Sequence, residues 1–282
     1  MYDEDNQEFF LSTDMSEKRL YITRPERIQS AALSPCCMGP EEIAYEMQFE
    51  KNPEILEICG MNQEGLEYFV SHYGKTYRFL YFFKCQLISD FSPLEDLKNL
   101  ESVRIYWNIR AGRLWNFSRN RVLHSIHFSN CKQMAFRPEL LKTSDALKNV
   151  FIAGGLFENY PLASLDCFAG MPALEHLRLV SLRLIDHGLG ALRALPSLTR
   201  FDFDAGMFKT EEIAWMVAHY PELEGTALCA YNKEDAILTD VRVCGFRKPG
   251  LNLPSQQERL DKYVAAFNTL VERYRSNPHL LP

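Results

Sequence analysis

Tyr77-Arg78-Phe79-Leu80-Tyr81-Phe82-Phe83-Lys84-Cys85-Gln86-Leu87 is the stretch of this 282-residue chain that decides its fold. Apolar residues stand at its first, fourth and sixth positions, and a cysteine and a leucine follow at the ninth and eleventh. The apolar triad recurs along the chain, mostly at intervals of 23 to 27 residues. The further copies are Pro53/Leu56/Ile58, Leu100/Val103/Ile105, Leu123/Ile126/Phe128, Leu147/Val150/Ile152, Leu174/Leu177/Leu179, Leu198/Phe201/Phe203, Leu223/Thr226/Leu228 and, after only 15 residues, Leu238/Val241/Val243.

Such a phrase is typical of a short parallel strand in a stack of repeats. Its alternate apolar side chains point inward, and the next repeat places its own strand about 4.8 Å away. The full phrase matches the template L-x-x-L-x-L-x-x-N/C-x-L, and the chain resembles the leucine-rich repeat family over residues 53–246. The fold expected is therefore α/β, a horseshoe-shaped solenoid with a parallel concave sheet and helices outside.

The Asn or Cys position of the template normally turns inward and satisfies backbone groups at the bend. Only Cys85, Asn108 and Cys131 match it. The equivalent places in the other copies hold Met61, Gly155, Leu182, Gly206, Tyr231 and Phe246. We still expect one parallel sheet, because the apolar triad persists through these departures. Its strands are predicted to centre near Leu56, Leu80, Val103, Ile126, Val150, Leu177, Phe201, Leu228 and Val241.

The segments between the strands show helical patterns of uneven quality. Thr210 followed by Glu211 and Glu212 predicts a helix with an N-cap and an acidic first turn. Shorter helices are expected within residues 186–195 and 164–169, and single turns or irregular structure within 113–121.

Both ends of the repeats need a cover, because a solenoid end otherwise exposes its apolar edge. Residues 1–52 are predicted to form a β-rich N-terminal cap, with a short strand at Leu20 and Ile22 and a second strand from Ile43 to Phe49, where apolar and polar residues alternate. Residues 247–282 are predicted to form a helical C-terminal cap. Ser255 and Glu258 have the spacing of a capping box, and an apolar stripe follows from Leu260 to Tyr274.

Composition narrows the class of partner. The net charge is −6 with both signs interspersed, so no basic stripe favours nucleic acid. No apolar run approaches the roughly 20 residues that cross a bilayer, and the acidic first residues lack the layout of a secretory signal. The eight cysteines lack zinc-ligand spacing, which favours reduced thiols and a cytoplasmic location. Cys229 and Cys244 occupy one column of consecutive predicted strands, which could bring their sulfurs close.

The sequence offers no catalytic motif of useful specificity. There is no phosphate-binding loop and no nucleophile elbow, and the seven histidines show no zinc spacing. Asp202 and Asp204 could be imagined as metal ligands, but both are expected to be solvated charges on the exposed side of one strand. We therefore predict no enzyme activity, no cofactor and no metal.

The concave face is the predicted site. If the triads face inward, the residues between and beside them form columns across the strands. Aromatic side chains gather on the second and third strands, and polar ones follow towards the C-terminal half. The predicted partner-binding residues are Phe79, Tyr81, Phe83, Arg104, Tyr106, Trp107, His127, Phe151, His176, Arg178, Arg200, Asp202 and Asp204.

Aromatic anchors beside arginine and aspartate are the composition of a protein-interaction hot spot. The leading hypothesis is a non-enzymatic module that binds a protein, as an inhibitor or scaffold, which is also the usual role in the family it resembles. The alternative is a glycan-binding or glycan-processing protein that stacks sugars on the aromatic patch. A further alternative is that the N-terminal cap covers this patch and buries it.

Overall fold

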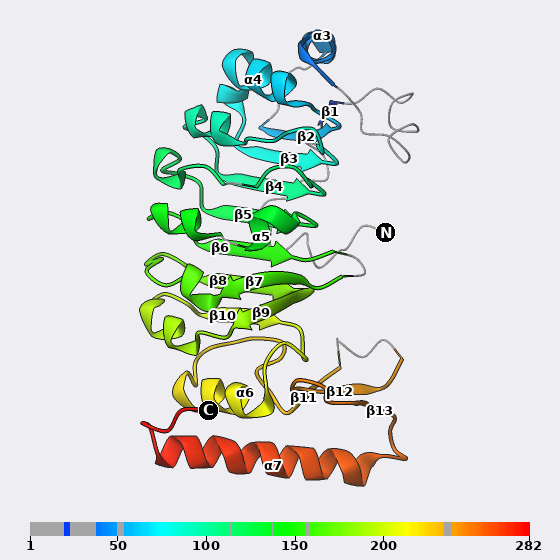
Figure 1. Ribbon diagram of the computed structural model, residues 1–282, viewed down its shortest axis with the longest axis vertical. Helices are drawn as coiled ribbons and strands as arrows, with labels where there is room; N and C mark the ends of the chain where they lie inside the picture. Colours follow the sequence, from blue (N-terminus) through cyan, green and yellow to red (C-terminus); the bar gives the residue numbers. More distant parts are fainter. Residues whose placement is uncertain are drawn as a thin grey trace.

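A computed structural model describes residues 20–22, 38–49, 54–112, 114–136, 138–155, 158–233 and 238–282. The fold is mixed α/β, an elongated stack built around one parallel sheet of order β1-β2-β3-β4-β5-β6-β8-β10 (Figure 1). These strands are Leu20–Ile22, Ile55–Cys59, Phe79–Phe83, Ser102–Tyr106, Ser125–Ser129, Asn149–Ala153, His176–Val180 and Arg200–Phe203. Seven of the nine predicted strands, from Leu56 to Phe201, pair in the expected order and register.

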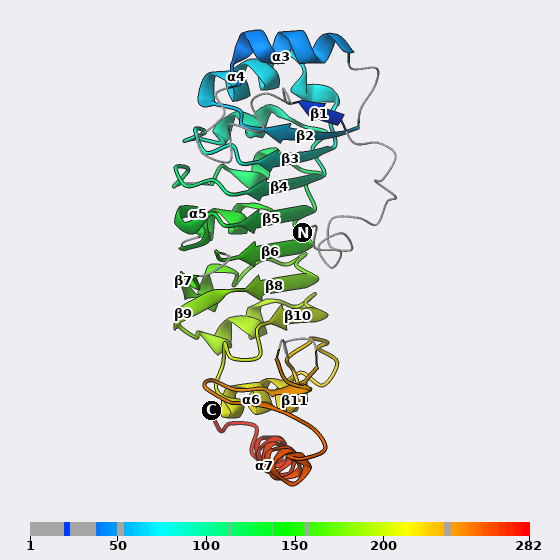
Figure 2. The same cartoon turned by 90° about the vertical axis from the view of Figure 1, so that its right-hand side faces the viewer.

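The apolar triads form the core, as predicted. The fourth and sixth positions of the phrase point to one side of the sheet, and from Leu56 to Phe203 they are at most 2% exposed. Figure 2 shows the strands of this sheet stacked one above another. Burial of apolar surface stabilises the folded state by about 25 cal/mol per Å². The buried triads therefore make the main contribution to the stability of the stack.

Short return segments cover the core on the other side. They are mostly single turns, because repeats of this length leave little room for full helices. The elements are α4 (Gln63–His72), η2 (Gly74–Thr76), η3 (Ser92–Asp96), η4 (Phe117–Arg119), α5 (Lys132–Phe136), η5 (Glu139–Thr143), η6 (Leu165–Cys167) and η7 (Leu189–Ala194). The shorter helices expected within 164–169 and 186–195 are thus present, and 113–121 holds a single turn, apart from Arg113, which lies outside the described residues.

Buried polar side chains hold the bends between strand and return segment. Asn108 donates to the carbonyls of Cys85 and Ile88 at 2.7 and 2.9 Å and accepts from the N–H groups of Arg110 and Ala111. Cys131 makes weaker thiol contacts of the same kind, to the carbonyl oxygens of Ile105 and Ser129. The inward role predicted for the Asn and Cys positions is confirmed.

Asn120 does the same on the return side, and the repeat pattern gives no sign of it. Its amide donates to the carbonyls of Leu94 and Leu97, and its oxygen accepts from Trp115 Nε1. Each buried group that is satisfied in this way avoids a desolvation penalty of about 1–3 kcal/mol.

A second, two-stranded parallel sheet pairs β7 (Tyr160–Ser164) with β9 (Leu182–Asp186), which the sequence reading missed. It forms where the Asn or Cys position is occupied by Gly155 and Leu182. The neighbouring Gly154 permits it, since a Cβ atom there would lie 1.8 Å from the Ser181 carbonyl oxygen. The extra pairing therefore depends on a close backbone approach that only glycine allows.

The parallel sheet ends earlier than predicted. Leu228 is not in a strand, and Val241 lies in β12 (Val241–Val243), which pairs antiparallel with β11 (Tyr231–Asn232) and β13 (Gly250–Leu251). The Phe201 N–H still donates to the Glu224 carbonyl, but the Thr226 N–H donates to the carboxylate of Asp202. The side chain of Asp202 thus takes a backbone donor of the expected next strand, and the chain leaves the sheet at Gly225.

The N-terminal end differs from the β-rich cap. The strand at Leu20–Ile22 is confirmed and pairs in parallel with β2, but the segment that begins at Ile43 is helical, with α3 (Pro40–Glu46) continued by η1 (Met47–Phe49). Pro40 in the first turn and the Glu42 carboxylate, which accepts from the Gly39 N–H at 3.0 Å, are helix-start signals that outweigh the alternation. The remainder of the predicted cap lies outside the described residues.

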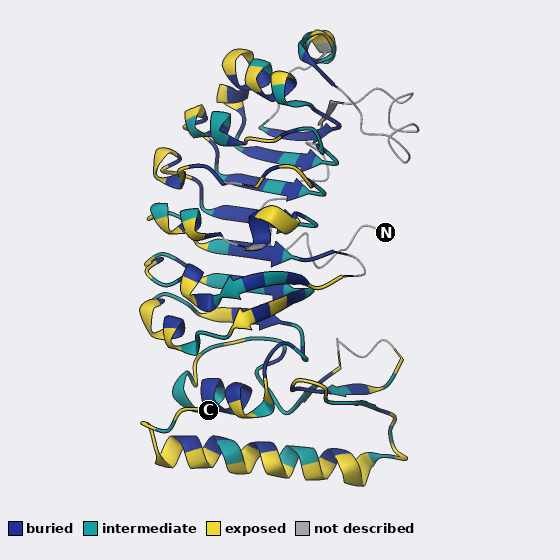
Figure 3. Ribbon diagram, viewed as in Figure 1, coloured by how far each residue is buried: buried dark blue, intermediate teal, exposed yellow. Residues whose placement is uncertain are grey.

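The C-terminal helix α7 (Gln257–Ser276) lies across the end of the stack beside α6 (Thr210–His219). It turns its apolar stripe inward, with Leu260, Phe267, Val271 and Tyr274 buried, and its exposed residues outward (Figure 3). No Ser255 capping box forms, because the Ser255 hydroxyl donates back to the Asn252 carbonyl.

The α6 prediction is off by one residue at its start. Thr210 is the first helical residue, and the preceding Lys209 N–H donates to the Glu212 carboxylate at 2.7 Å. The Thr210 hydroxyl instead bonds to the Cys244 carbonyl, which ties α6 to the segment after β12.

Candidate functional site

The central row is the line of residues at the middle of the strands, on the sheet face opposite the core. It runs Glu57, Tyr81, Arg104, His127, Phe151, Arg178 and Asp202, in register from β2 to β10. The sequence columns predicted this order. The row does not continue onto the strands predicted near Leu228 and Val241, because the parallel sheet ends at β10.

An aromatic patch lies at the β3–β4 end of this face and consists of Phe79, Tyr81, Phe83, Tyr106 and Trp107. The rings of Phe83 and Tyr106 stack with centroids 5.4 Å apart, and Tyr81 meets Phe83 edge-on at 5.9 Å. Phe79 is buried at 6% exposure, whereas the other four are half-buried. The alternative in which the N-terminal cap covers this patch concerns residues that lie mostly outside the described ranges.

Trp107 belongs to the patch because of an unusual backbone conformation. Its φ is 58°, in the left-handed region, so the chain turns sharply out of β4 at this residue. The ammonium group of Lys84, which is left-handed in the same way after β3, lies 5.1 Å from the Trp107 ring and 5.2 Å from that of Phe83. The aromatic patch thus ends on a positive charge.

The middle of the central row alternates cations and rings. The Arg104 guanidinium lies over the Tyr81 ring at 4.7 Å, and that of Arg178 lies over the Phe151 ring at 5.0 Å. His127, between them, stacks on Phe151 with centroids 4.0 Å apart. Cation–π contacts of this kind contribute about 0.5–2 kcal/mol each and hold the arginines against the sheet.

His127 is the most deeply buried polar group of the row, at 1% exposure. Burial lowers the pKa of His127 well below its usual range, and the charges of Arg104 and Arg178 lower it further. The imidazole is therefore neutral near pH 7. Within the described part of the chain, neither of its ring nitrogens has a hydrogen-bond partner.

Other polar atoms near His127 are also buried without a hydrogen-bond partner among the described residues. The hydroxyl groups of Ser102 and Ser125, which pair across β4 and β5, and the Nε atom of Arg104 are buried without a partner among the described residues. Buried polar groups are nearly always hydrogen-bonded in folded proteins. The two serines were assigned to the face from the sequence but were not singled out, because a small hydroxyl gives no pattern of its own.

Asp202 is a structural carboxylate, and its prediction as a solvated charge is wrong. It is 3% exposed, and one oxygen accepts from His176 Nε2 at 2.8 Å and from Arg200 Nε at 2.7 Å. Burial alone would raise the pKa of Asp202, but the bonds from His176 and the Thr226 N–H and the charge of Arg200 outweigh it and lower the pKa to about 2.

Asp204 is also engaged, since it accepts from the Ser181 N–H at 2.6 Å. The carboxylate of Asp202 in β10 and that of Asp204 just after it thus hold the end of the sheet. They are not a free acid–base pair beside the aromatic patch, as glycan hydrolysis would require.

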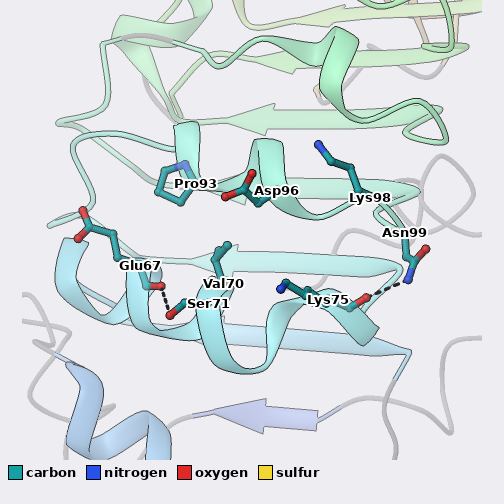
Figure 4. Close-up of a pocket in the computed structure, with 8 residues that line it drawn as sticks. All are labelled: Glu67, Val70, Ser71, Lys75, Pro93, Asp96, Lys98 and Asn99. Carbon is teal, nitrogen blue, oxygen red and sulfur yellow. Dashed lines mark hydrogen bonds between the residues drawn. The ribbon is translucent and has the colours of Figure 1, made fainter.

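The rest of the described chain offers a groove but no metal-ligand cluster and no helix that could span a membrane. Its residues hold no cluster of three potential metal ligands, and none of its helices is long and apolar enough to span a membrane. A groove of about 750 Å³ lies between α4 and η3 (Figure 4). Polar groups on its rim bond to nearby backbone, as Ser71 does to the Glu67 carbonyl and Asn99 to that of Lys75.

The six described cysteines form no disulfide with one another. The sulfur atoms of Cys229 and Cys244 lie 3.9 Å apart, as the sequence suggested, although Cys229 is in a loop and not in a strand. Cys36 and Cys37 lie outside the described residues.

The chain matches no model of a known protein family and no characterised protein in sequence. The site is therefore judged on its geometry alone.

Proposed function

We propose that this chain is a leucine-rich repeat solenoid that binds a partner protein through the face carrying the central row, without catalysis. The observation that carries the proposal is the combination, on one continuous parallel sheet, of half-buried aromatic side chains with Arg104 and Arg178, which have no carboxylate partner among the described residues. Adjacent strands are about 4.8 Å apart, so the eight strands span about 34 Å. That width accommodates the roughly 800 Å² per partner of a standard interface.

Two features support the repeat assignment within this proposal. The strands recur in register at the spacing of the sequence repeat, and buried Asn and Cys side chains stand at the bends where the family template has them. The described cysteines form no disulfide with one another, which favours a reducing compartment, and we infer a cytoplasmic location.

The test is affinity capture from source lysate with the wild-type chain and three variants. Tyr81→Ala and Trp107→Ala remove half-buried anchors. Ile185→Ala is the matched control, because Ile185 is 60% exposed on β9, which belongs to the two-stranded sheet. We expect one stoichiometric protein with the wild type and the control. Binding to it should weaken by about 2 kcal/mol or more for each anchor variant, the usual size of a hot-spot truncation.

A thermal melt of the same variants separates binding from folding. Since both side chains are half-buried, each change should cost about 1–2 kcal/mol of stability, between a surface and a core substitution. Retention of the chain by polysaccharide arrays without a protein partner would favour the glycan alternative. Undiminished capture by both anchor variants would contradict the proposed face.

A further inference from the structure

We propose that Arg104 and Arg178 form a two-point site for an extended acidic segment of the partner, with one aspartate or glutamate side chain on each guanidinium group. This inference rests on the proposed function and names the chemistry that the face recognises. The two arginines stand in the central row on β4 and β8, with β5 and β6 between them.

The first support is uncompensated charge. The guanidinium groups of Arg104 and Arg178 lie on aromatic rings, and neither pairs with a carboxylate of the described residues. By contrast, Arg200 on the next strand is paired with Asp202 at 2.7 Å. Both arginines are half-buried, and the chain carries a net charge of −6, so two guanidinium groups without a carboxylate partner among the described residues form a local positive site on an acidic molecule.

The second support is unsatisfied polarity between the two charges. The Nε atom of Arg104, both ring nitrogens of His127 and the hydroxyls of Ser102 and Ser125 are buried without partners within the described ranges. A neutral imidazole has one donor and one acceptor, which matches the C=O and N–H of a peptide backbone. A carboxylate on Arg104 can accept from Nε and a terminal nitrogen together, the strongest geometry for such a pair.

Access to His127 requires a side chain to move. Its ring is 1% exposed and stacks on Phe151, over which the Arg178 guanidinium lies. A carboxylate that draws Arg178 off the Phe151 ring replaces a cation–π contact with an ion pair and uncovers this part of the row. Ligand binding and exposure of the imidazole are thereby coupled.

The third support is spacing. Three strand intervals of about 4.8 Å separate Arg104 from Arg178 by about 14 Å along the row. In an extended peptide that crosses the strands, side chains four residues apart lie on the same side and are about 13 Å apart. The acidic residues should therefore be four positions apart, and an aromatic or aliphatic residue two positions before the first of them lies on the same side and would reach Tyr81 in the aromatic patch.

The experiment uses the full chain and fluorescence anisotropy with a labelled peptide, Gly-Tyr-Ser-Glu-Ser-Thr-Ser-Glu-Ser-Gly. Comparison peptides replace both glutamates with glutamine or place them two positions apart. We expect the first peptide to bind at least about tenfold more tightly than either comparison peptide, because each lost charge pair is worth roughly a factor of ten.

Variants assign the binding to the two side chains. Arg104→Met and Arg178→Met should each weaken binding of the acidic peptide about tenfold, whereas Arg104→Lys should keep part of it. Arg183→Met is the control, because Arg183 is exposed on β9 in the other layer. A thermal melt of every variant shows that the fold is intact, and the Lys variant keeps the test decisive if a Met variant fails to fold.

The outcomes separate this inference from the proposed function. Equal affinity for the glutamine peptide, or unchanged binding by both Met variants, overturns the acidic site. If a captured partner then still depends on Tyr81 and Trp107, the binding face stands without it. If the acidic peptide binds as expected but no partner is captured, the two-arginine site stands and the proposed protein-binding function fails.

Discussion

Two regions of this molecule carry the same apolar triad and fold differently. From Tyr77 to Phe128 the triads form adjacent parallel strands, whereas from Leu223 to Val243 they form a loop and one strand of an antiparallel sheet. The first region has Cys85, Asn108 and Cys131 bonded to backbone at the bends. The second has Tyr231 and Phe246 in those places. Apolar spacing thus selects which side chains are buried in both regions, while buried polar groups at the bends add backbone bonds in the first region alone.

The largest expected effect comes from removing the cover of the irregular end. Deletion of residues 255–282 removes α7 and with it Phe267, Val271 and Tyr274 from the core, and removes the Leu280 carbonyl that accepts from Trp215 Nε1. The exposed edge should make the chain aggregate. Size-exclusion chromatography with light scattering measures this, with Lys262→Ala on the exposed side of α7 as control. A truncated chain that stays monomeric with an unchanged melting temperature would show that α7 is not a cap.

Asn108→Ala attacks the regular region directly. The change removes four hydrogen bonds at the bend, although the Cys85 carbonyl still accepts from the Ile88 N–H and Arg110 is exposed. Since each can cost about 1–3 kcal/mol and the losses are not additive, we expect roughly 4 kcal/mol of destabilisation in urea unfolding. Asn99→Ala, at an exposed site with one bond to the Lys75 carbonyl, should cost under about 1 kcal/mol. Similar losses of stability in Asn108→Ala and Asn99→Ala would mean that the buried hydrogen bonds at the bends do not stabilise the regular region.

These bends also mark how far the sequence could predict the fold. The triads predicted seven strands and their register, because alternation and a fixed period translate directly into strand pairing. The two-stranded sheet of β7 and β9 was missed, since it depends on the close approach of Gly154 to Ser181, a tertiary contact without a pattern. The early end of the sheet was missed because it depends on one side chain, Asp202, taking the Thr226 N–H.

For the site, the sequence predicted the order of the central row but not its burial. It placed Arg104, His127 and Arg178 on one face, which the register confirms. It could not distinguish a buried, bonded carboxylate from a solvated one, so Asp202 was misjudged, and it gave no sign of the bond that Asp204 accepts. Their partners, the N–H groups of Thr226 and Ser181, belong to backbone that every residue carries.

Oxidation of Cys229 and Cys244 to a disulfide should raise the free energy of unfolding. Both residues lie in the irregular region, where the chain does not continue the parallel sheet. Their sulfurs are 3.9 Å apart and 15 residues apart in sequence. Diamide accepts the two electrons and two protons as the S–S bond forms. Closing a loop of this length should stabilise the chain by at most about 3 kcal/mol. Urea unfolding of oxidised and reduced protein measures it, and Cys229→Ser should abolish the difference. Unchanged free thiol content after diamide would contradict the prediction.

Asp202→Asn tests the boundary between the two regions. The folded pKa of about 2 lies below the ordinary value of 3.8, so the carboxylate stabilises the fold above about pH 4 and loses this effect as the pH falls towards 2. The variant should lose about 2 kcal/mol at pH 7 and approach the wild type near pH 2. Urea unfolding at both pH values measures this, with the exposed Asp186→Asn as control. A deficit independent of pH would mean that the charge is not responsible.

The smallest effect concerns the exits of the parallel strands, where the backbone turns left-handed after β2, β3, β4, β5 and β8. Gly60 stands at the first exit, but Ser181, with a φ of 51°, stands at the last. Left-handed backbone costs a residue with a side chain about 1–2 kcal/mol, and glycine avoids this while losing about 0.5–1 kcal/mol in chain entropy.

The Ser181 N–H donates to Asp204 and its carbonyl accepts from the Tyr160 N–H, and glycine keeps both groups. Ser181→Gly should therefore stabilise the fold by roughly 0.5 kcal/mol in urea unfolding, whereas Ser129→Gly, in the extended backbone of β5, should destabilise it by a similar amount. Loss of stability in both variants would show that these exits are not strained, and that the regular region owes its geometry to the buried bends alone.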